Sequence, residues 1–356
     1  MAIAVFIRQL SLGGAEKQSL LLARELQMKY RTFLVVWSRQ TIAPEYHDFI
    51  EKNGVSVVYL KGNAPLKFFR MWRFLKENRV THLFNFLLIN NFVGGLTGRM
   101  AGVKHIYGGI RNCEIVSSKL RAQRLIHNFI SHKTIFNNYS GTKKLASQGF
   151  NKDKMVVVHN GIDVDKYSYT PFETKIKKKD KVVLFAGRVT LQKGPDYFID
   201  AAHKVCQKMK NVKFVLAGNG DMLNRCIRMV AERGLSKNFI FPGRYSKEEG
   251  VKLMNMADVF VMPSVSEPFG LVPLEAMLQK TPAIISKQSG VNEVLANALK
   301  IDFWDTHQMA NKIISVLKYG ALQDQLSEYG SVEAGAMTWD PAAEKCHNIF
   351  DKLARL

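Results

Sequence analysis

Short apolar runs alternate with longer amphipathic segments along most of the chain. The first run, residues 3–7, is followed by a Gly-Gly turn and by a segment in which Leu20, Leu21 and Leu26 recur at helical spacing. The alternation continues through the first half of the chain, and a second series begins at residues 182–186. Strands that alternate with helices at this spacing predict doubly wound parallel sheets of the α/β class.

One polar, lysine-rich segment with little periodicity, residues 163–180, separates the two series. We interpret it as a linker and predict two Rossmann-like domains, residues 1–162 and 181–338. The length of 356 residues suits two domains. Two such domains leave a crevice at which the carboxyl ends of both sheets face each other, and open α/β sheets bind ligands at those ends.

The stretch SVSEPFGLVPLEAM, residues 264–277, carries the sharpest local signal. An apolar run that predicts a buried strand precedes it, and a helix is expected to begin near Gly270. This order offers backbone N–H groups and a helix N-terminus to an anion. Glu267 in the loop and Glu275 in the helix are better placed to accept hydrogen bonds from hydroxyls than to face a phosphate. The inferred ligand is a sugar nucleotide; the alternative is a capping glutamate and a solvated one.

Glu-Pro-Phe-Gly followed by a second glutamate resembles the E-x7-E signature of family 4 retaining glycosyltransferases. The resemblance implies the GT-B architecture, in which two Rossmann-like doubly wound parallel-sheet domains face a central cleft. It also implies that residues 339–356 form a helix that returns to the N-terminal domain. By the same resemblance Glu267 contacts the donor sugar, and Glu275 contacts the ribose. Backbone amides at three further positions would meet the sugar and diphosphate: Phe269, Gly270 and Leu271.

Two cations, Arg188 and Lys193, lie in GRVTLQKG, a loop bounded by glycines after an apolar run. Both side chains can converge on one anion, the guanidinium as a bidentate clamp and the ammonium as a compact charge. The resemblance implies that they bind the diphosphate and stabilise the charge on the departing nucleotide. With Glu267 they are the predicted catalytic residues. The alternative is a pair of solvated surface cations.

Other strand-to-helix turns extend the resemblance over both domains. Gly14 lies in a turn that is not a GxGxxG fingerprint, and the resemblance places it beside the diphosphate, whereas a plain tight turn is the alternative. The resemblance makes Gly218 and Asn219 of AGNGD, with Arg244 of FPGR, donor-binding residues. Arg111 stands where many relatives have a histidine near the donor sugar. We therefore name it as a possible sugar or acceptor contact.

The net charge of +21 is concentrated in the first half. Residues 1–160 contain 24 lysines and arginines against 8 acidic residues, a balance of +16. Cations interleave with aromatic and aliphatic residues in two predicted helices, residues 67–79 and 117–133. Such helices bind anionic bilayers, or they pack on a core while their cations reach solvent. We predict peripheral attachment to an anionic membrane surface at its cytoplasmic side, and a glycan or lipid-linked glycan as acceptor.

Several other classes of protein fit less well. No signal peptide or membrane-spanning segment is evident, and four scattered cysteines suggest reduced thiols and no zinc site. The resemblance implies that no cofactor or metal is needed, and the DVD triplet at 163–165 lies in the expected linker. Two alternatives stay open. One is a sugar-nucleotide epimerase of the same architecture, and the other is a basic nucleic-acid-binding protein, although we expect no nucleic acid as partner because no RNA- or DNA-binding motif is present.

The resemblance implies transfer of a hexose-like unit with retention at the anomeric carbon. A hydrolase with this outcome would use a carboxylate nucleophile, and Glu267 resembles one. The family is instead described by same-face attack, in which the leaving phosphate takes the acceptor proton. The residues alone leave both mechanisms open.

Overall fold

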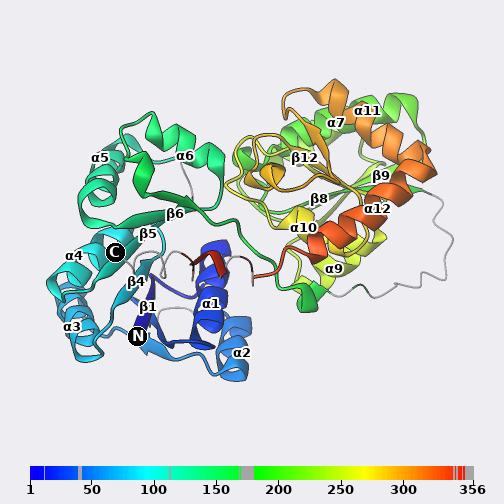
Figure 1. Cartoon of the computed structure of the whole chain (residues 1–356). Coiled ribbons are helices and arrows are strands. Elements are labelled where there is room, and N and C mark those ends of the chain that lie inside the picture. Colours follow the sequence, from blue (N-terminus) through cyan, green and yellow to red (C-terminus); the bar gives the residue numbers. More distant parts are fainter. Residues whose placement is uncertain are drawn as a thin grey trace. The chain divides into compact units, whose positions relative to one another are not determined.

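The computed structural model divides into two compact units (Figure 1). Unit 1 comprises Met1–Gly161 together with Trp339–Leu356, and unit 2 comprises Ile162–Thr338. The C-terminal residues therefore group with the first unit. The structure describes residues 1–11, 13–38, 42–111, 114–167, 169, 180–339, 341, 344–346 and 348.

Unit 1 is built on a parallel sheet of seven strands in the order β3-β2-β1-β4-β5-β6-β7. The strands are β1 (Ala2–Ile7), β2 (Arg31–Val36), β3 (Val57–Tyr59), β4 (His82–Asn85), β5 (His105–Ile110), β6 (Lys133–Phe136) and β7 (Met155–Val157). The helices are α1 (Gly14–Gln27), α2 (Pro44–Asn53), α3 (Ala64–Glu77), α4 (Leu88–Met100), α5 (Ser117–Leu125), the π-helix η1 (Ile126–Ile130), α6 (Tyr139–Ala146) and the short η2 (Lys152–Lys154).

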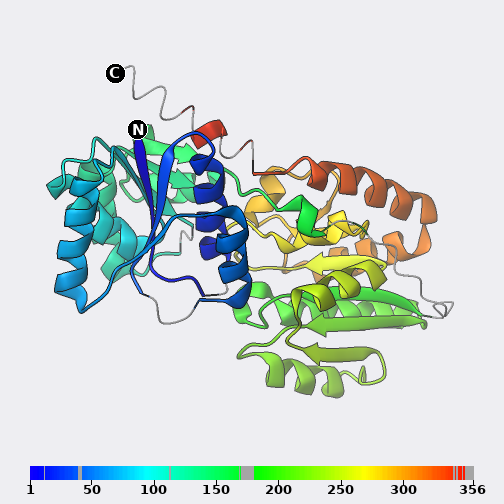
Figure 2. The same cartoon turned by 90° about the horizontal axis from the view of Figure 1, so that it is seen from below.

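Alternating side chains of β1 supply two separate cores, one on each face of the sheet. Ile3 and Val5 belong to the core that includes α1 and α2, whereas Ala4 and Phe6 belong to the core that includes α3. Figures 1 and 2 show α3 and α4 on one side of this sheet and α1 and α2 on the other. A strand buried on both faces reads as a continuous apolar run, which explains the all-apolar sequence of residues 2–7. Trp339 packs in the core on the α1 side.

Unit 2 contains a parallel sheet of six strands in the order β10-β9-β8-β11-β12-β13. The strands are β8 (Lys181–Ala186), β9 (Val212–Ala217), β10 (Phe239–Gly243), β11 (Val259–Met262), β12 (Ala283–Ser286) and β13 (Leu299–Ile301). The longer helices are α7 (Pro195–Lys208), α8 (Leu223–Glu232), α9 (Lys247–Met256), α10 (Val272–Leu278), α11 (Thr306–Lys318) and α12 (Gly320–Gly335). Short helices η3 (Val164–Tyr167), η4 (Leu191–Lys193) and η5 (Gly290–Glu293) lie between them. The strand order reverses between β8 and β11, the kind of position at which doubly wound sheets bind ligands.

The predicted fold class, α/β with two parallel Rossmann-like sheets, is confirmed. Two elements differ from what the sequence indicated. Strand β13 was not expected, because three residues are too few to show a period. Val164–Tyr167 of the expected linker form η3, which contacts α10 within unit 2. Residues 168 and 170–179 of that linker, and most of the helix expected at 339–356, lie outside the described residues.

Three histidine rings lie close together at the amino edge of the sheet in unit 1. His82 and His105 are paired in register across β4 and β5, with ring centroids 4.7 Å apart, and the His132 ring lies 5.7 Å from that of His105. The backbone N–H of Ile106 donates to Nδ1 of His132 at 3.0 Å. Burial lowers the pKa of all three rings, to about 4 for His82, and the charge of Lys104 lowers the pKa of His82 and His105 further.

We predict that acid destabilises unit 1 through these rings. The folded-state pKa lies below the unfolded value, so the unfolded chain takes up protons first and stability falls as the pH drops from about 6.5 towards about 4. Each pKa unit corresponds to about 1.4 kcal/mol in the free energy of unfolding. Urea titrations followed by tryptophan fluorescence should show this loss for the natural chain and a smaller one for His82→Asn. His47→Asn, at an exposed position of α2, is the control, and equal acid sensitivity of all three proteins would contradict the prediction.

Candidate functional site

The turns at the carboxyl edge of the unit 2 sheet are joined by backbone hydrogen bonds. The N–H of Gly187 donates to Ala217 O at 3.0 Å, and the N–H of Gly218 donates to Gly243 O at 2.8 Å. Gly218 has φ +136°, and a Cβ atom there would collide with the carbonyl oxygen of Gly187. Only glycine allows the turns after β8 and β9 to approach this closely. The predicted residue Gly218 is thus required by backbone packing.

The loop after β8 is also joined to the loop after β11. The N–H of Val265 donates to Gln192 O at 3.0 Å. Gly194 caps α7 in the left-handed region with φ +65°, and a Cβ atom there would collide with the carbonyl oxygen of Pro263. Two loops separated by about 70 residues in the sequence are therefore held together by backbone contacts.

Lys193 and Glu267 form an ion pair across this junction. The Lys193 ammonium donates to Oε2 of Glu267, and the two side chains are only 17% and 10% exposed. Removing one partner from a largely buried pair leaves the other charge without compensation, which is costly. The pair therefore holds both side chains in place, and the structure brings together two of the predicted catalytic residues.

A third loop, after β12, fixes the backbone of Glu267. Its N–H donates to Gln288 O at 3.1 Å, and its carbonyl oxygen accepts from Gly290 N at 2.9 Å. Gly270 follows with φ +97°, and a Cβ atom there would lie 3.1 Å from Cγ of Glu267. Phe269, between them, is buried in the core below. The backbone from 267 to 270 is therefore fixed by the loop after β12 and by the packing of Phe269 in the core.

Glu275 lies in the first turn of α10, and its partner is a residue that sequence reasoning missed. Tyr167 Oη donates to Oε1 of Glu275 at 2.7 Å, and the Lys247 ammonium lies 5.0 Å from the centroid of the Tyr167 ring. Burial, with a smaller contribution from the charge of Glu275, raises the pKa of Tyr245 to about 12. A carboxylate that already accepts from one hydroxyl suits a ligand with further hydroxyls. No sequence pattern could have identified Tyr167, because its surroundings had been interpreted as a linker.

The remaining predicted residues of unit 2 lie at the turns that follow the strands. Arg188, Asn219 and Arg244 follow β8, β9 and β10, and all three are exposed. Neither arginine forms an ion pair with any residue that the structure describes. Leu271 is the N-cap residue of α10. These turns lie at the carboxyl edge of one sheet, which is also the edge that carries the Lys193–Glu267 pair.

Gly14 of unit 1 is the first residue of α1, and nothing lies within 4 Å of the position of a Cβ atom there. The preceding residue, Gly13, accepts a hydrogen bond from Tyr46 Oη at 3.0 Å. Burial raises the pKa of Glu16 in the same turn. The turn is therefore fixed by Tyr46 and leaves open space beside Gly14.

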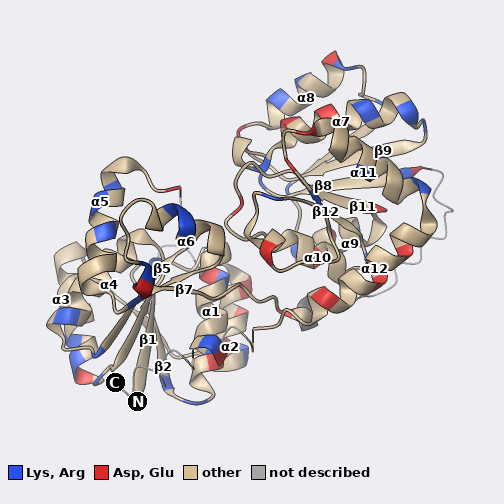
Figure 3. Cartoon of the chain, turned by 45° about the horizontal axis from the view of Figure 1, so that its top comes forward, with Lys and Arg blue, Asp and Glu red and all other residues tan. Residues whose placement is uncertain are grey.

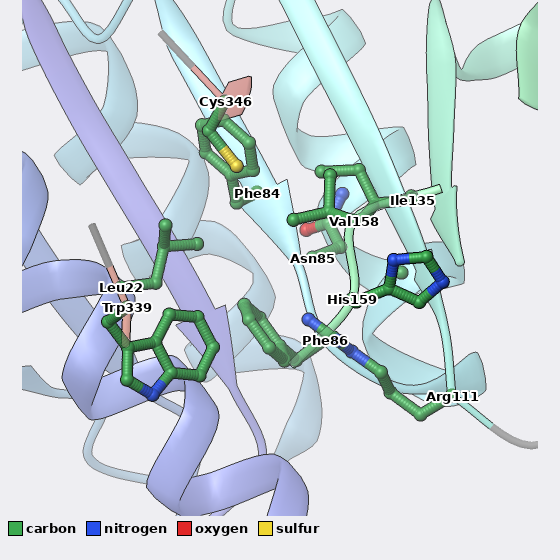
Figure 4. A pocket seen from close by; sticks show the side chains of 12 residues that line it. Leu22, Phe84, Asn85, Phe86, Arg111, Ile135, Val158, His159, Trp339 and Cys346 are labelled. Carbon is green, nitrogen blue, oxygen red and sulfur yellow. The ribbon is translucent and has the colours of Figure 1, made fainter. Parts of the chain in front are cut away.

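Arg111 follows β5 and is shown in Figure 4. Its Nη1 donates to Asn160 Oδ1 at 2.7 Å, its guanidinium lies 4.9 Å from the centroid of the Phe86 ring, and its buried Nε has no hydrogen-bond partner in the described chain. Burial lowers the pKa of Arg111 to about 10. Arg111 also lines a cavity of about 20 Å³, to which Trp339 and Cys346 contribute. A partly desolvated guanidinium without a carboxylate partner in the described residues can donate hydrogen bonds to a ligand oxygen.

No group of three or more His, Cys, Asp or Glu side chains in the described part of the chain could hold a metal ion. None of the helices described here combines the length and the apolar character that crossing a membrane requires.

Residues 169–332, nearly all of unit 2, match the family model described as "Glycosyl transferases group 1". Unit 2 is a group 1 glycosyltransferase domain. An uncharacterised glycosyltransferase of Methanocaldococcus jannaschii is 37% identical over 153 residues, which cover 40% of this chain and 39% of that protein. Alpha-D-kanosaminyltransferase of Streptomyces kanamyceticus is 27% identical over 176 residues, covering 48% of this chain and 46% of that protein. The chain thus spans less than half the length of these curated relatives.

A solved structure extends the likeness in fold to both units of the chain. The Anabaena protein HepE in complex with UDP and glucose superposes with a TM-score of 0.84 at 19% identity, and the match covers 100% of both chains. At this identity the likeness concerns the fold alone. It agrees with the GT-B class that the sequence predicted.

We predict that Gly194→Ala damages the junction between the loops, whereas Gly234→Ala is a milder change. Both glycines are left-handed, at φ +65° and φ +67°, but nothing lies within 4 Å of a Cβ atom at Gly234. Gly194→Ala must also displace Pro263, so it should lower the free energy of unfolding by about 1–3 kcal/mol more than the control. Urea denaturation measures this difference, and equal losses for the two variants would show that the junction tolerates a side chain.

Proposed function

We propose that this glycosyltransferase moves a hexose-like sugar from a nucleotide-diphosphate donor to a hydroxyl of a glycan or lipid-linked glycan, with retention at the anomeric carbon. The observation that carries the proposal is the Lys193–Glu267 pair at the edge of the sheet, with Glu275 in the adjoining helix. A cation and two carboxylates there suit a ligand with both phosphate and hydroxyl groups. The family match of unit 2 supports this reaction class.

Each of these residues would bind a different part of the donor. Arg188 and Lys193 bind the diphosphate, Glu267 the sugar hydroxyls, and Glu275 the ribose hydroxyls. Further donor contacts are proposed for the exposed turns and for the amides at the start of α10: Gly14, Gly218, Asn219, Arg244, Phe269, Gly270 and Leu271. Arg111 would contact the sugar or the acceptor.

The reaction breaks the bond between the anomeric carbon and the phosphate oxygen of the donor, and it forms a bond from that carbon to the acceptor oxygen. The nucleotide diphosphate leaves with the electron pair, and its phosphate oxygen takes the proton of the acceptor hydroxyl. Lys193 would stabilise the developing negative charge. Because Lys193 pairs with Glu267, a diphosphate that binds the ammonium would compete with this carboxylate and leave its oxygen for sugar hydroxyls.

The proposal includes no metal or other cofactor, so EDTA should leave turnover unchanged. UDP-glucose is the first donor to test, because HepE has been crystallised with UDP and with UDP-glucose. Unit 1 would recognise the acceptor at the cytoplasmic side of an anionic membrane, and we propose no nucleic acid as partner.

A donor screen and a matched pair of variants test this function. One nucleotide diphosphate among UDP, GDP and ADP should raise the melting temperature, and its sugar should support transfer. Lys193→Ala should lower turnover by about 100-fold or more, because it removes a cation from the leaving group. Lys181→Ala is the control, since Lys181 pairs with Asp258 at the amino end of β8. Normal turnover in Lys193→Ala would remove this residue from the mechanism, and no stabilisation by any nucleotide would overturn the function.

Arg111→Gln tests the contribution of unit 1. If the guanidinium contacts the acceptor, the variant should raise the acceptor KM while the melting shift caused by the nucleotide is retained. Arg31→Gln is the control, because Arg31 bonds to Asn78 at the start of β2. An unchanged acceptor KM and kcat would show that Arg111 serves only the packing of Phe86 and Asn160.

A further inference from the structure

Helix α4 is inverted relative to an ordinary amphipathic helix. Its buried residues are small or polar: Asn90, Asn91, Gly94, Gly95, Thr97 and Gly98. Its exposed residues include Ile89, Phe92 and Met100, which are 51%, 50% and 64% exposed. The spacing of three and eight residues keeps these apolar side chains along one outward stripe of the helix. Burial in the core therefore does not account for Ile89, Phe92 and Met100.

The inward face of α4 explains how the helix folds without using those apolar side chains. A Cβ atom at Gly94 would collide with Oδ1 of Asn85, and one at Gly98 would lie 2.9 Å from Cδ2 of Leu83. The Asn91 side chain donates to Gly109 O at 3.0 Å and accepts from Gly109 N at 2.9 Å. Close backbone approach and these hydrogen bonds seat the helix on the sheet. The outward apolar stripe is therefore not needed to hold α4 on the sheet.

Neighbouring helices extend this stripe into one surface. Figures 1 and 2 show α3, α4 and α5 along the same side of unit 1, and α4 contacts α3, α5 and η1. Trp72 Nε1 of α3 donates to Met100 O at 3.3 Å, and the Phe69 and Trp72 rings lie 5.4 Å apart. We define the apolar face as the exposed, large apolar residues of α3, α4, α5 and η1. They are Leu66, Phe69, Ile89, Phe92, Met100, Leu125 and Phe129, the last of which is 71% exposed.

Cations surround the apolar face. Figure 3 shows Lys and Arg along α3 and α5, with few acidic residues. The exposed cations of these helices and of α4 are Arg70, Arg73, Lys76, Arg99, Lys119, Arg121 and Arg124. Within α3, Glu77 pairs with Arg73, and α5 itself contains no acidic residue. An apolar stripe bordered by excess positive charge matches the boundary between acyl chains and anionic headgroups. A nucleic acid would use the cations, but it would leave Ile89, Met100 and Leu125 in water.

We propose that α4 inserts its outward side chains, with Phe69 and Phe129, into the interface of an anionic bilayer, while the cations of α3 and α5 contact the headgroups. This inference refines the membrane partner proposed above and concerns unit 1 alone. It differs from attachment by charge only, which salt would abolish. Apolar insertion leaves measurable binding after the charges are screened.

Vesicle flotation tests the insertion. The natural chain should float with vesicles of phosphatidylglycerol and phosphatidylcholine at about 0.05 M NaCl and retain part of this binding at about 0.5 M. The double variant Phe92→Ser/Met100→Ser should bind at least about 10-fold more weakly, because two apolar side chains no longer leave water. The control is Ile227→Ser/Val332→Ser, which removes two exposed apolar side chains, 44% and 70% exposed, from unit 2.

The depth to which the apolar face enters the bilayer is measured with lipids whose acyl chains are brominated. Because Trp72 bonds to Met100 at the border of the apolar face, its fluorescence should be quenched by such lipids, and the quenching should decrease in Trp72→Phe. Unchanged binding of the Phe92/Met100 variant overturns the proposal, as does binding that disappears at high salt without quenching. Binding to RNA but not to vesicles overturns it too. The melting shift given by a nucleotide reports on unit 2 in every variant, so failure here is distinct from failure of the proposed reaction.

Discussion

The ion pair between Lys193 and Glu267 is the contact on which the arrangement of unit 2 depends. It joins the loop after β8 to the loop after β11 at the position where the strand order reverses. Largely buried charges need fixed partners, and here the partners are fixed by backbone contacts at Gly194 and by the bridge between Glu267 and Ser289. The charges and the glycine act together. Gly194 permits the two loops to approach closely, and the ion pair stabilises them in that position.

How far the sequence predicts the structure depends on the range of the interaction. Apolar runs identified nearly all strands, because central strands such as β1 and β11 are buried along their whole length and are locally apolar. The same local patterns singled out Glu267, Glu275, Arg188 and Lys193. They could not show that Lys193 pairs with Glu267, 74 residues away, or that Tyr167 bonds to Glu275, 108 residues away. Strand β13 was missed for a related reason, since its identity rests on pairing with β12 and not on its own three residues.

The two units differ in how far their charged side chains are paired with opposite charges. Unit 2 neutralises much of its charge internally, as in the pairs of Lys193 with Glu267 and of Arg233 with Asp200. Unit 1 holds most of the net positive charge, and Arg111 lies half-buried beside Asn160 and Phe86 with no carboxylate partner in the described chain. A desolvated cation of this kind is stabilised when an anion or an electron-rich oxygen approaches. This imbalance is the physical basis on which we propose an acceptor and a membrane surface as partners of unit 1.

Glycine has opposite consequences in the two units for one physical reason. In unit 2, Gly194 and Gly218 let loops approach so closely that polar side chains gather at one edge of the sheet. In unit 1, Gly94 and Gly98 let α4 approach the sheet so closely that a side chain at either position would meet Asn85 or Leu83. The exposed apolar side chains of α4 point outward, where water is an unfavourable neighbour. A periodicity argument that assumes apolar residues face the core assigns the faces of such a helix the wrong way round, and the close glycine contacts are what reverse them.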